Sequence, residues 1–233
     1  MLISGSFAII NAMPSVARSQ LLAIYERLHS FLGPSGWWPG ESSLEVIVGA
    51  ILTQNTSWRN VEQALDRLKQ EGALSVERLT RMGEAQLAEW IRPAGYYRIK
   101  ARRLKNFFRF LQEEYHGQIG ALSEQPLEKV REQLLGIRGV GPETADSILL
   151  YALGKPTFVV DTYTHRIFSR HRLVPEESDY EDLRTFFMEA LPEDVPLFNE
   201  FHALMVRTGK TYCKKKAPLC GDCPLRDLEP ENH

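Results

Sequence analysis

Two glycines around one apolar residue, Gly139-Val140-Gly141, place the tightest constraint on how this chain can fold. They separate two stretches whose apolar residues recur at helical spacing, and glycine tolerates the positive φ angles of a tight turn. Such a turn leaves backbone N–H groups bare at the start of the next helix, where a phosphate is the natural ligand. The sequence therefore predicts two helices joined by a phosphate-binding turn. A short apolar run then ends at Asp161, at the predicted start of another helix.

Apolar residues recur at intervals of three and four along most of the chain, which is typical of helices packed on a core. The predicted helices cover about residues 15–32, 44–52, 58–68, 84–92, 98–115, 126–136, 142–153, 161–171, 178–190 and 195–209. No stretch alternates with the period of a half-buried strand, and no apolar run approaches the roughly 20 residues that cross a bilayer. We expect an all-α, monomeric, cytoplasmic protein with no membrane partner.

The charges are unevenly distributed along the chain. A formal net charge of −2 argues against a uniformly basic nucleic-acid binder. Two runs are nevertheless locally basic: Arg98, Lys100, Arg102, Arg103 and Lys105, and then Arg207, Lys210, Lys214, Lys215 and Lys216. We expect the basic residues near 100 to lie off the apolar stripe, free for solvent or phosphate.

Three cysteines, Cys213, Cys220 and Cys223, lie within eleven residues near the C-terminal end. Secreted proteins stapled by disulfides spread more cysteines over the chain. Close spacing favours a metal or cluster instead.

Thr144-Ala145 follows the turn, and Asp161 lies further along the chain. In their order and spacing, these residues resemble the helix-hairpin-helix segment of the endonuclease III superfamily of DNA glycosylases. The resemblance implies an all-α fold of two domains with the active-site cleft between them. The first would cover residues 44–156 and end in the hairpin. The second would combine residues 1–43 with 157–233. It also implies that Gly139, Val140 and Gly141 hold a DNA phosphate, with a monovalent cation bound by the turn carbonyls.

The same resemblance makes Asp161 the catalytic carboxylate, which would stabilise positive charge on the sugar or orient a water. The plainer interpretation is an N-cap of the next helix, and the two roles are compatible. Glu143 decides the subclass, because bifunctional members of the family carry at this position a lysine that attacks the sugar. A carboxylate cannot form that imine, and Lys155 is too remote to replace the lysine. Glu143 can also be simply a first-turn residue favoured by the helix dipole.

Two further segments are the loop Gly36-Trp37-Trp38-Pro39 and the stretch from Gly49 to Thr56. Both are similar to segments of the third class of bacterial 3-methyladenine DNA glycosylase. There, aromatic residues sandwich a flipped, cationic alkylated purine, which electron-rich rings attract. On this chain the matching positions are Trp37, Trp38 and Pro39, with Trp58 opposite. Gln54 would fill the gap that the flipped base leaves in the duplex. Trp58 can instead be a core residue, and Gln54 a polar residue at a helix end.

The cysteines reproduce the first three positions of the family's four-cysteine iron–sulfur loop, but the fourth position holds Glu229. The resemblance implies a [4Fe–4S] cluster with Glu229 as an oxygen ligand. Zinc or three reduced thiols are alternatives. A cluster would brace Lys214 and Lys215 toward DNA phosphates.

The resemblance, with Glu143 in place of the lysine, implies a monofunctional DNA glycosylase of base excision repair, associated with the nucleoid. It would bind double-stranded DNA that contains a damaged base, hydrolyse the glycosidic bond of an alkylated purine and leave an abasic site. The alternatives are an oxidised-pyrimidine or mismatch glycosylase, and a non-catalytic hairpin protein that binds damaged DNA.

Overall fold

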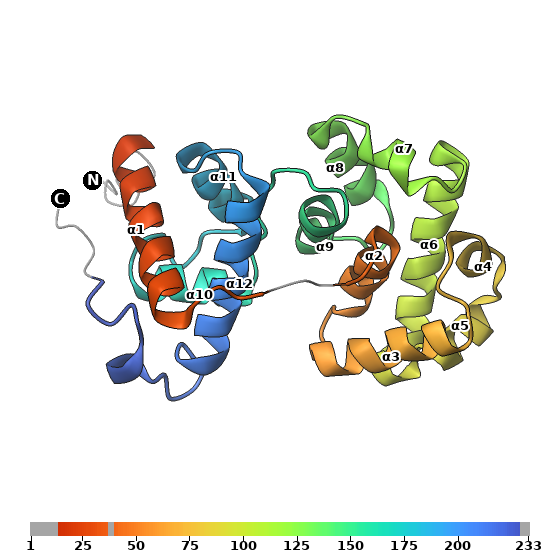
Figure 1. Ribbon diagram of the computed structural model, residues 1–233, viewed down its shortest axis with the longest axis horizontal. Helices are drawn as coiled ribbons and strands as arrows, with labels where there is room; N and C mark the ends of the chain where they lie inside the picture. The colour runs from red at the N-terminus through yellow and green to blue at the C-terminus, as the bar shows by residue number, and fades with distance from the viewer. Residues whose placement is uncertain (1–13, 37–39, 229–233) are drawn as a thin grey trace, which may run out of the picture. The chain divides into compact units, whose positions relative to one another are not determined.

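The structure, a computed structural model, describes residues 14–36 and 40–228. In these ranges the ordered elements are twelve α-helices and three short helical turns, with no strand (Figure 1). The all-α prediction is therefore confirmed. The described residues divide into two compact units. We call residues 40–155 the hairpin unit, and residues 14–36 with 156–228 the aspartate unit.

The hairpin unit is built around α6 (Tyr97–Tyr115), whose buried face includes Leu104, Phe107, Phe108 and Leu111. Figure 1 shows α6 as the long yellow-green helix of this unit. The other helices of the unit are α2 (Ser43–Leu52), α3 (Trp58–Gln70), α4 (Val76–Arg81), α5 (Glu84–Trp90), α7 (Ile119–Ser123), α8 (Leu127–Gly136) and α9 (Pro142–Ser147). A 3₁₀ turn, η1 (Arg92–Ala94), precedes α6, and a π-helical turn, η2 (Ile148–Ala152), continues α9. Helix α6 contacts α2, α4, α5, α7 and η1.

Helix α2 is apolar on nearly every side because it lies inside the hairpin unit, against α3, α6, α9 and η2. Ser42 begins it as an N-cap, since its side chain accepts a hydrogen bond from Glu45 N. The helix ends just before Gln54, so the core packing of α2 sets where that side chain begins.

The aspartate unit contains α1 (Pro14–Leu32), α10 (Thr162–Arg170), α11 (Tyr180–Ala190), α12 (Val195–Thr211) and the short turn η3 (Cys220–Asp222). Helix α12 packs against α10 and α1. The core of the aspartate unit is aromatic. The ring centroids of Phe158 and Phe187 lie 3.8 Å apart in a stacked pair, and the Phe201 ring contacts both edge-on. Phe158 belongs to the extended apolar run before Asp161, so this cluster anchors that run.

The expectation for the basic residues near position 100 was wrong in part. Lys100 is only 1% exposed, and its ammonium donates to Leu52 O and Ala94 O. Lys105 is partly buried and donates to carbonyls at the end of α4, a helix that the periodicity did not predict. Lys100 lies one turn before Leu104 on the apolar face, and the last carbonyls of a helix lack partners within the helix. Both ammonium groups therefore bind carbonyls at helix ends and are not free to bind phosphate.

Candidate active site

The predicted hairpin is formed by α8, α9 and the turn between them. Pro142 is the first residue of α9, a position where its missing N–H costs nothing. Gly139 has a φ of +101°, and a Cβ added there would lie 2.4 Å from Arg103 Cγ. Only glycine fits this position, both for its backbone angle and for its close contact with α6.

The amides of the turn are not all open to a ligand. Val140 N already donates to Ile137 O, and Pro142 has no N–H. Among the described residues, the N–H groups of Gly139 and Gly141 have no hydrogen-bond acceptor. A phosphate at this turn would be bound by these two.

A buried ion pair holds the two helices of the hairpin together. The Arg131 guanidinium on α8 donates to both carboxylate oxygens of Asp146 on α9, at 2.9 and 3.1 Å. Asp146 is completely buried and the Arg131 side chain is 10% exposed. The pair fixes the spacing of α8 and α9, and therefore the shape of the turn between them.

Gln54 follows α2 and lies on the hairpin. Its Nε2 donates to Gly139 O at 3.2 Å and to Thr144 Oγ1 at 2.9 Å. Its Oε1 is buried, and within the described part of the chain it has no hydrogen-bond partner. The structure thus brings Gln54 together with the turn that is predicted to bind phosphate. For Gln54 to fill the duplex as predicted, these two hydrogen bonds would have to break.

Of the predicted base-pocket residues, Trp58 lies in the described part of the chain, whereas Trp37, Trp38 and Pro39 lie outside it. Trp58 begins α3, and its indole N–H donates to Glu62 Oε1 at 2.9 Å. Its ring packs on Gly49 of α2, where an added Cβ would lie 3.3 Å from the ring. The ring is only partly buried, so it packs on the core and is also accessible to solvent.

Asp161 is the N-cap of α10, as its position in the sequence predicts. Its Oδ1 accepts three hydrogen bonds, from Tyr163 N at 2.9 Å, Thr164 N at 2.7 Å and Thr164 Oγ1 at 2.9 Å. Burial by itself raises the pKa of this carboxyl, but the adjacent His202 and the Thr164 hydrogen bonds outweigh it and hold the pKa below its usual range. Asp161 is therefore ionised near neutral pH.

Sequence reasoning missed His202 of α12. Its Nε2 lies 3.7 Å from Asp161 Oδ2, and both side chains are about nine-tenths buried. One signal was available: His202 is a single titratable residue in a run of apolar residues on α12, between Phe201 and Ala203. Its approach to Asp161 depends on how α12 packs on α10, which periodicity does not show.

Glu143 occupies the first turn of α9, and its side chain is exposed. This is the position where a nucleophilic lysine was expected in a bifunctional enzyme. Glu143 belongs to the hairpin unit, whereas Asp161 and His202 belong to the aspartate unit.

The cysteine loop follows α12. Cys213 and Cys223 are buried, Cys220 is exposed, and all three are free thiols. Glu229 lies outside the described residues. Among residues 14–36 and 40–228, no three His, Cys, Asp or Glu side chains form a group that could hold a metal ion. The described cysteines do not by themselves fit a cluster, so the [4Fe–4S] cluster and the cation at the turn stay predictions, and no step below depends on either.

Two arginines of α10 brace the same loop. Arg166 Nε donates to Cys213 O at 2.7 Å, and Arg170 donates to Lys214 O and Lys215 O at 2.7 and 3.0 Å. The side chains of Lys214 and Lys215 are exposed. The sequence led us to expect that a cluster would hold this loop. In the structure, the guanidinium groups of two arginines hold the loop backbone.

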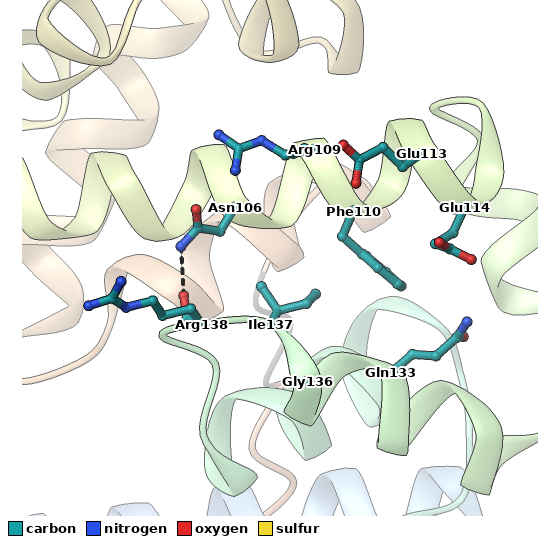
Figure 2. Close-up of a pocket in the computed structure, with 9 residues that line it drawn as sticks. All are labelled: Asn106, Arg109, Phe110, Glu113, Glu114, Gln133, Gly136, Ile137 and Arg138. Carbon is teal, nitrogen blue, oxygen red and sulfur yellow. Dashed lines mark hydrogen bonds between the residues drawn. The ribbon is translucent and has the colours of Figure 1, made fainter.

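A cavity of about 520 Å³ lies beside the hairpin, between α6 and the start of the turn (Figure 2). Asn106 Nδ2 donates to Arg138 O at 2.8 Å across it. Figure 2 shows Phe110 and Ile137 facing each other there, with Arg109 from α6 nearby. None of the residues predicted to act on a base or a sugar lines this cavity.

Comparisons with known proteins agree with this arrangement. The family described as HhH-GPD superfamily base excision DNA repair protein matches residues 48–193. A protein of Methanocaldococcus jannaschii that bears the provisional name DNA repair glycosylase MJ1434 is 47% identical over 88% of this chain and 93% of its own length. Endonuclease III of Thermotoga maritima is 32% identical over 78% of this chain and 80% of its own.

Solved structures give the same result. The 3-methyladenine DNA glycosylase MagIII of H. pylori, solved with 1,N6-ethenoadenine, matches with a TM-score of 0.71 and 29% identity over 82% of this chain and 97% of its own. A complex of endonuclease III with DNA matches in fold, with a TM-score of 0.77 and 23% identity over 92% of this chain and 95% of its own. No described helix of this chain is long and apolar enough to span a membrane. The helix-hairpin-helix, the capping aspartate and these matches together establish that the chain belongs to the HhH-GPD superfamily of base excision repair proteins, as a DNA glycosylase.

Proposed function

We propose that this protein is a monofunctional DNA glycosylase that removes alkylated purines, such as 3-methyladenine, and leaves an intact abasic site. The observation that carries the proposal is that positions 161 and 143 both hold a carboxylate. Asp161 is buried and held ionised, and Glu143 stands where a bifunctional enzyme has its lysine.

The ionised carboxylate suits the reaction. Loss of a base passes through a transition state with positive charge on the sugar, which a nearby carboxylate stabilises. A water oxygen bonds to the sugar C1′, the bond from C1′ to the base nitrogen breaks, and its electron pair leaves on the base. The proton lost by the water passes to Asp161 or to solvent. Because an alkylated purine carries positive charge, it leaves as a neutral base and needs little acid catalysis.

The absence of a lysine at position 143 sets the product. An amine that attacks the sugar forms an imine and leads to strand cleavage, whereas a carboxylate cannot form an imine. Glu143 therefore supports simple hydrolysis. The DNA would be held at the hairpin by the N–H groups of Gly139 and Gly141 and, in the aspartate unit, by the exposed Lys214 and Lys215.

Aromatic side chains support an alkylated purine as the substrate. Trp58 offers an accessible indole ring, and a cationic base over such a ring gains about 0.5–2 kcal/mol. Trp37, Trp38 and Pro39 are proposed as the other wall of the pocket. The likeness to H. pylori MagIII, whose structure holds an ethenoadenine base, supports the same substrate class. The likeness to endonuclease III of Thermotoga maritima makes oxidised pyrimidines the substrate to test beside it.

The test is release of bases from three duplexes: one containing 3-methyladenine, one containing an oxidised pyrimidine, and one undamaged. Freed bases are separated by chromatography, and the DNA is examined for strand breaks before and after alkali. We expect free 3-methyladenine, with breaks only after alkali. Release of the oxidised pyrimidine alone would overturn the substrate class. Breaks without alkali, or a borohydride-trapped complex, would overturn the monofunctional mechanism.

A pair of matched variants tests the catalytic aspartate. Asp161→Asn keeps a side chain that can cap α10 but removes its charge, so we expect base release to fall by several orders of magnitude while binding to abasic DNA persists. Asp179→Asn is the control, because Asp179 also caps a helix, α11, by accepting from Asp182 N. A fully active Asp161→Asn variant would remove Asp161 from the reaction.

A further inference from the structure

The two carboxylate oxygens of Asp161 have different surroundings. Oδ1 is occupied by the three donors of its own helix, from Tyr163 and Thr164. Oδ2 has no such donor among the described residues, and it faces Nε2 of His202 at 3.7 Å. Helix capping therefore uses one oxygen and leaves the other for chemistry.

The helix that carries His202 is held firmly against the helix that carries Asp161. A Cβ added to Gly209 of α12 would lie 2.3 Å from Tyr163 Cδ1, so α10 and α12 meet in direct contact there. Arg166 of α10 also donates to Gly209 O. Since both helices are fixed, the distance from His202 to Asp161 is a property of the fold rather than of a mobile side chain at the surface.

We propose that His202 is the positioning residue for Asp161: its imidazole directs Oδ2 and supplies the neighbouring charge that keeps a buried carboxylate ionised. The inference rests on the proposed function of Asp161. A distance of 3.7 Å is too long for a hydrogen bond but well within the range of an ion pair. His202 touches neither base nor sugar in this role, since it acts through the carboxylate.

The charges near Asp161 leave few alternatives. In the described part of the aspartate unit, His202 is the only basic group within 4.0 Å of this carboxylate. From α11, the Tyr180 hydroxyl lies 3.5 Å from Val160 N, but a phenol is uncharged below about pH 10. His202 is therefore the neighbouring group that favours ionised Asp161.

Two substitutions separate position from charge. His202→Gln keeps an amide nitrogen near Oδ2 without a full charge, and His202→Leu removes both. The control is His165→Gln, because His165 lies on α10 with Asp161 but its Nε2 contacts Glu176 O and Ser178 O instead. Single-turnover base release is measured from pH 4 to 9, with spontaneous base loss subtracted, beside affinity for abasic DNA and the melting temperature.

We expect the acidic limb of the rate profile to move up by about one pH unit or more in both His202 variants, as loss of an adjacent opposite charge does. At pH 7 we expect the rate of His202→Leu to fall by about tenfold, and His202→Gln to recover much of that loss because it restores the direction of Oδ2. DNA affinity should change little in either variant. His165→Gln should keep the wild-type profile.

An unmoved acidic limb in a folded His202→Leu variant would overturn the inference, and so would an equal fall for His165→Gln. If wild type releases no base at all, the proposed function fails, but the pairing is still tested by carboxyl NMR titration of Asp161. A rise in the Asp161 pKa on replacing His202 would then support the pairing by itself. An unchanged pKa would refute it independently of activity.

Discussion

Replacing Asp146 with asparagine should destabilise the hairpin unit severely. The change keeps the shape of the side chain but leaves the Arg131 guanidinium, only 10% exposed, facing a neutral amide. Breaking a buried ion pair by removing one partner costs about 3–5 kcal/mol, because the remaining charge stays in a low-dielectric site without the carboxylate that Asp146 supplied. A domain is stable by only about 5–15 kcal/mol in total. Asp146→Asn should therefore use up much of the stability of this unit.

The double variant Arg131→Met/Asp146→Leu should be far less damaging than Asp146→Asn alone. Well-packed apolar residues in place of a buried pair are often neutral, since no charge has to be taken out of water. The exposed pair Arg81 and Glu77, at 2.7 Å on one face of α4, is the control. Glu77→Gln should cost less than about 0.5 kcal/mol.

The assay is urea unfolding combined with hydrogen exchange of the α8 and α9 amides, because the two units of the chain need not unfold together. The exchange data report opening of the hairpin itself. If Asp146→Asn lost less than about 1 kcal/mol, or the double variant lost as much as the single one, the reasoning about a broken buried ion pair would be refuted.

Lys100, also in the hairpin unit, should make the stability of this unit depend on pH. Burial lowers the pKa of Lys100 from 10.5 to about 8, so the unfolded chain binds more protons than the folded one between these values. The unfolding free energy of wild type relative to Lys100→Met should therefore rise by about 3 kcal/mol as the pH is raised from 8 to 10.5, and a flat difference in urea titrations would contradict this. Gly139→Ala should cost about 1–3 kcal/mol, because its φ of +101° is strained for alanine and its Cβ would meet Arg103. Gly141→Ala, with no heavy atom within 4 Å of the added Cβ and an ordinary φ, should melt near wild type, and equal losses would disprove the argument.

Local patterns were sufficient for much of the fold and part of the site. The helical spacing predicted α6 and α12 to within a few residues, but it missed the short α4 and α7, which contain too few residues to show a period. The glycine turn and the capping position of Asp161 were predictable because each depends on the few residues beside it.

The sequence by itself determined which functional groups each unit carries: a turn that only glycine can make and Glu143 in the hairpin unit, and a carboxylate at the start of α10 in the aspartate unit. The tertiary structure alone decided how those groups are supported. It brought Gln54 into contact with Gly139, 85 residues away, and the Lys100 ammonium into contact with the carbonyl of Leu52, 48 residues away. It also set His202 beside Asp161. Periodicity reports only on neighbours within a few turns of one helix, whereas these contacts arise where helices distant in the chain pack together.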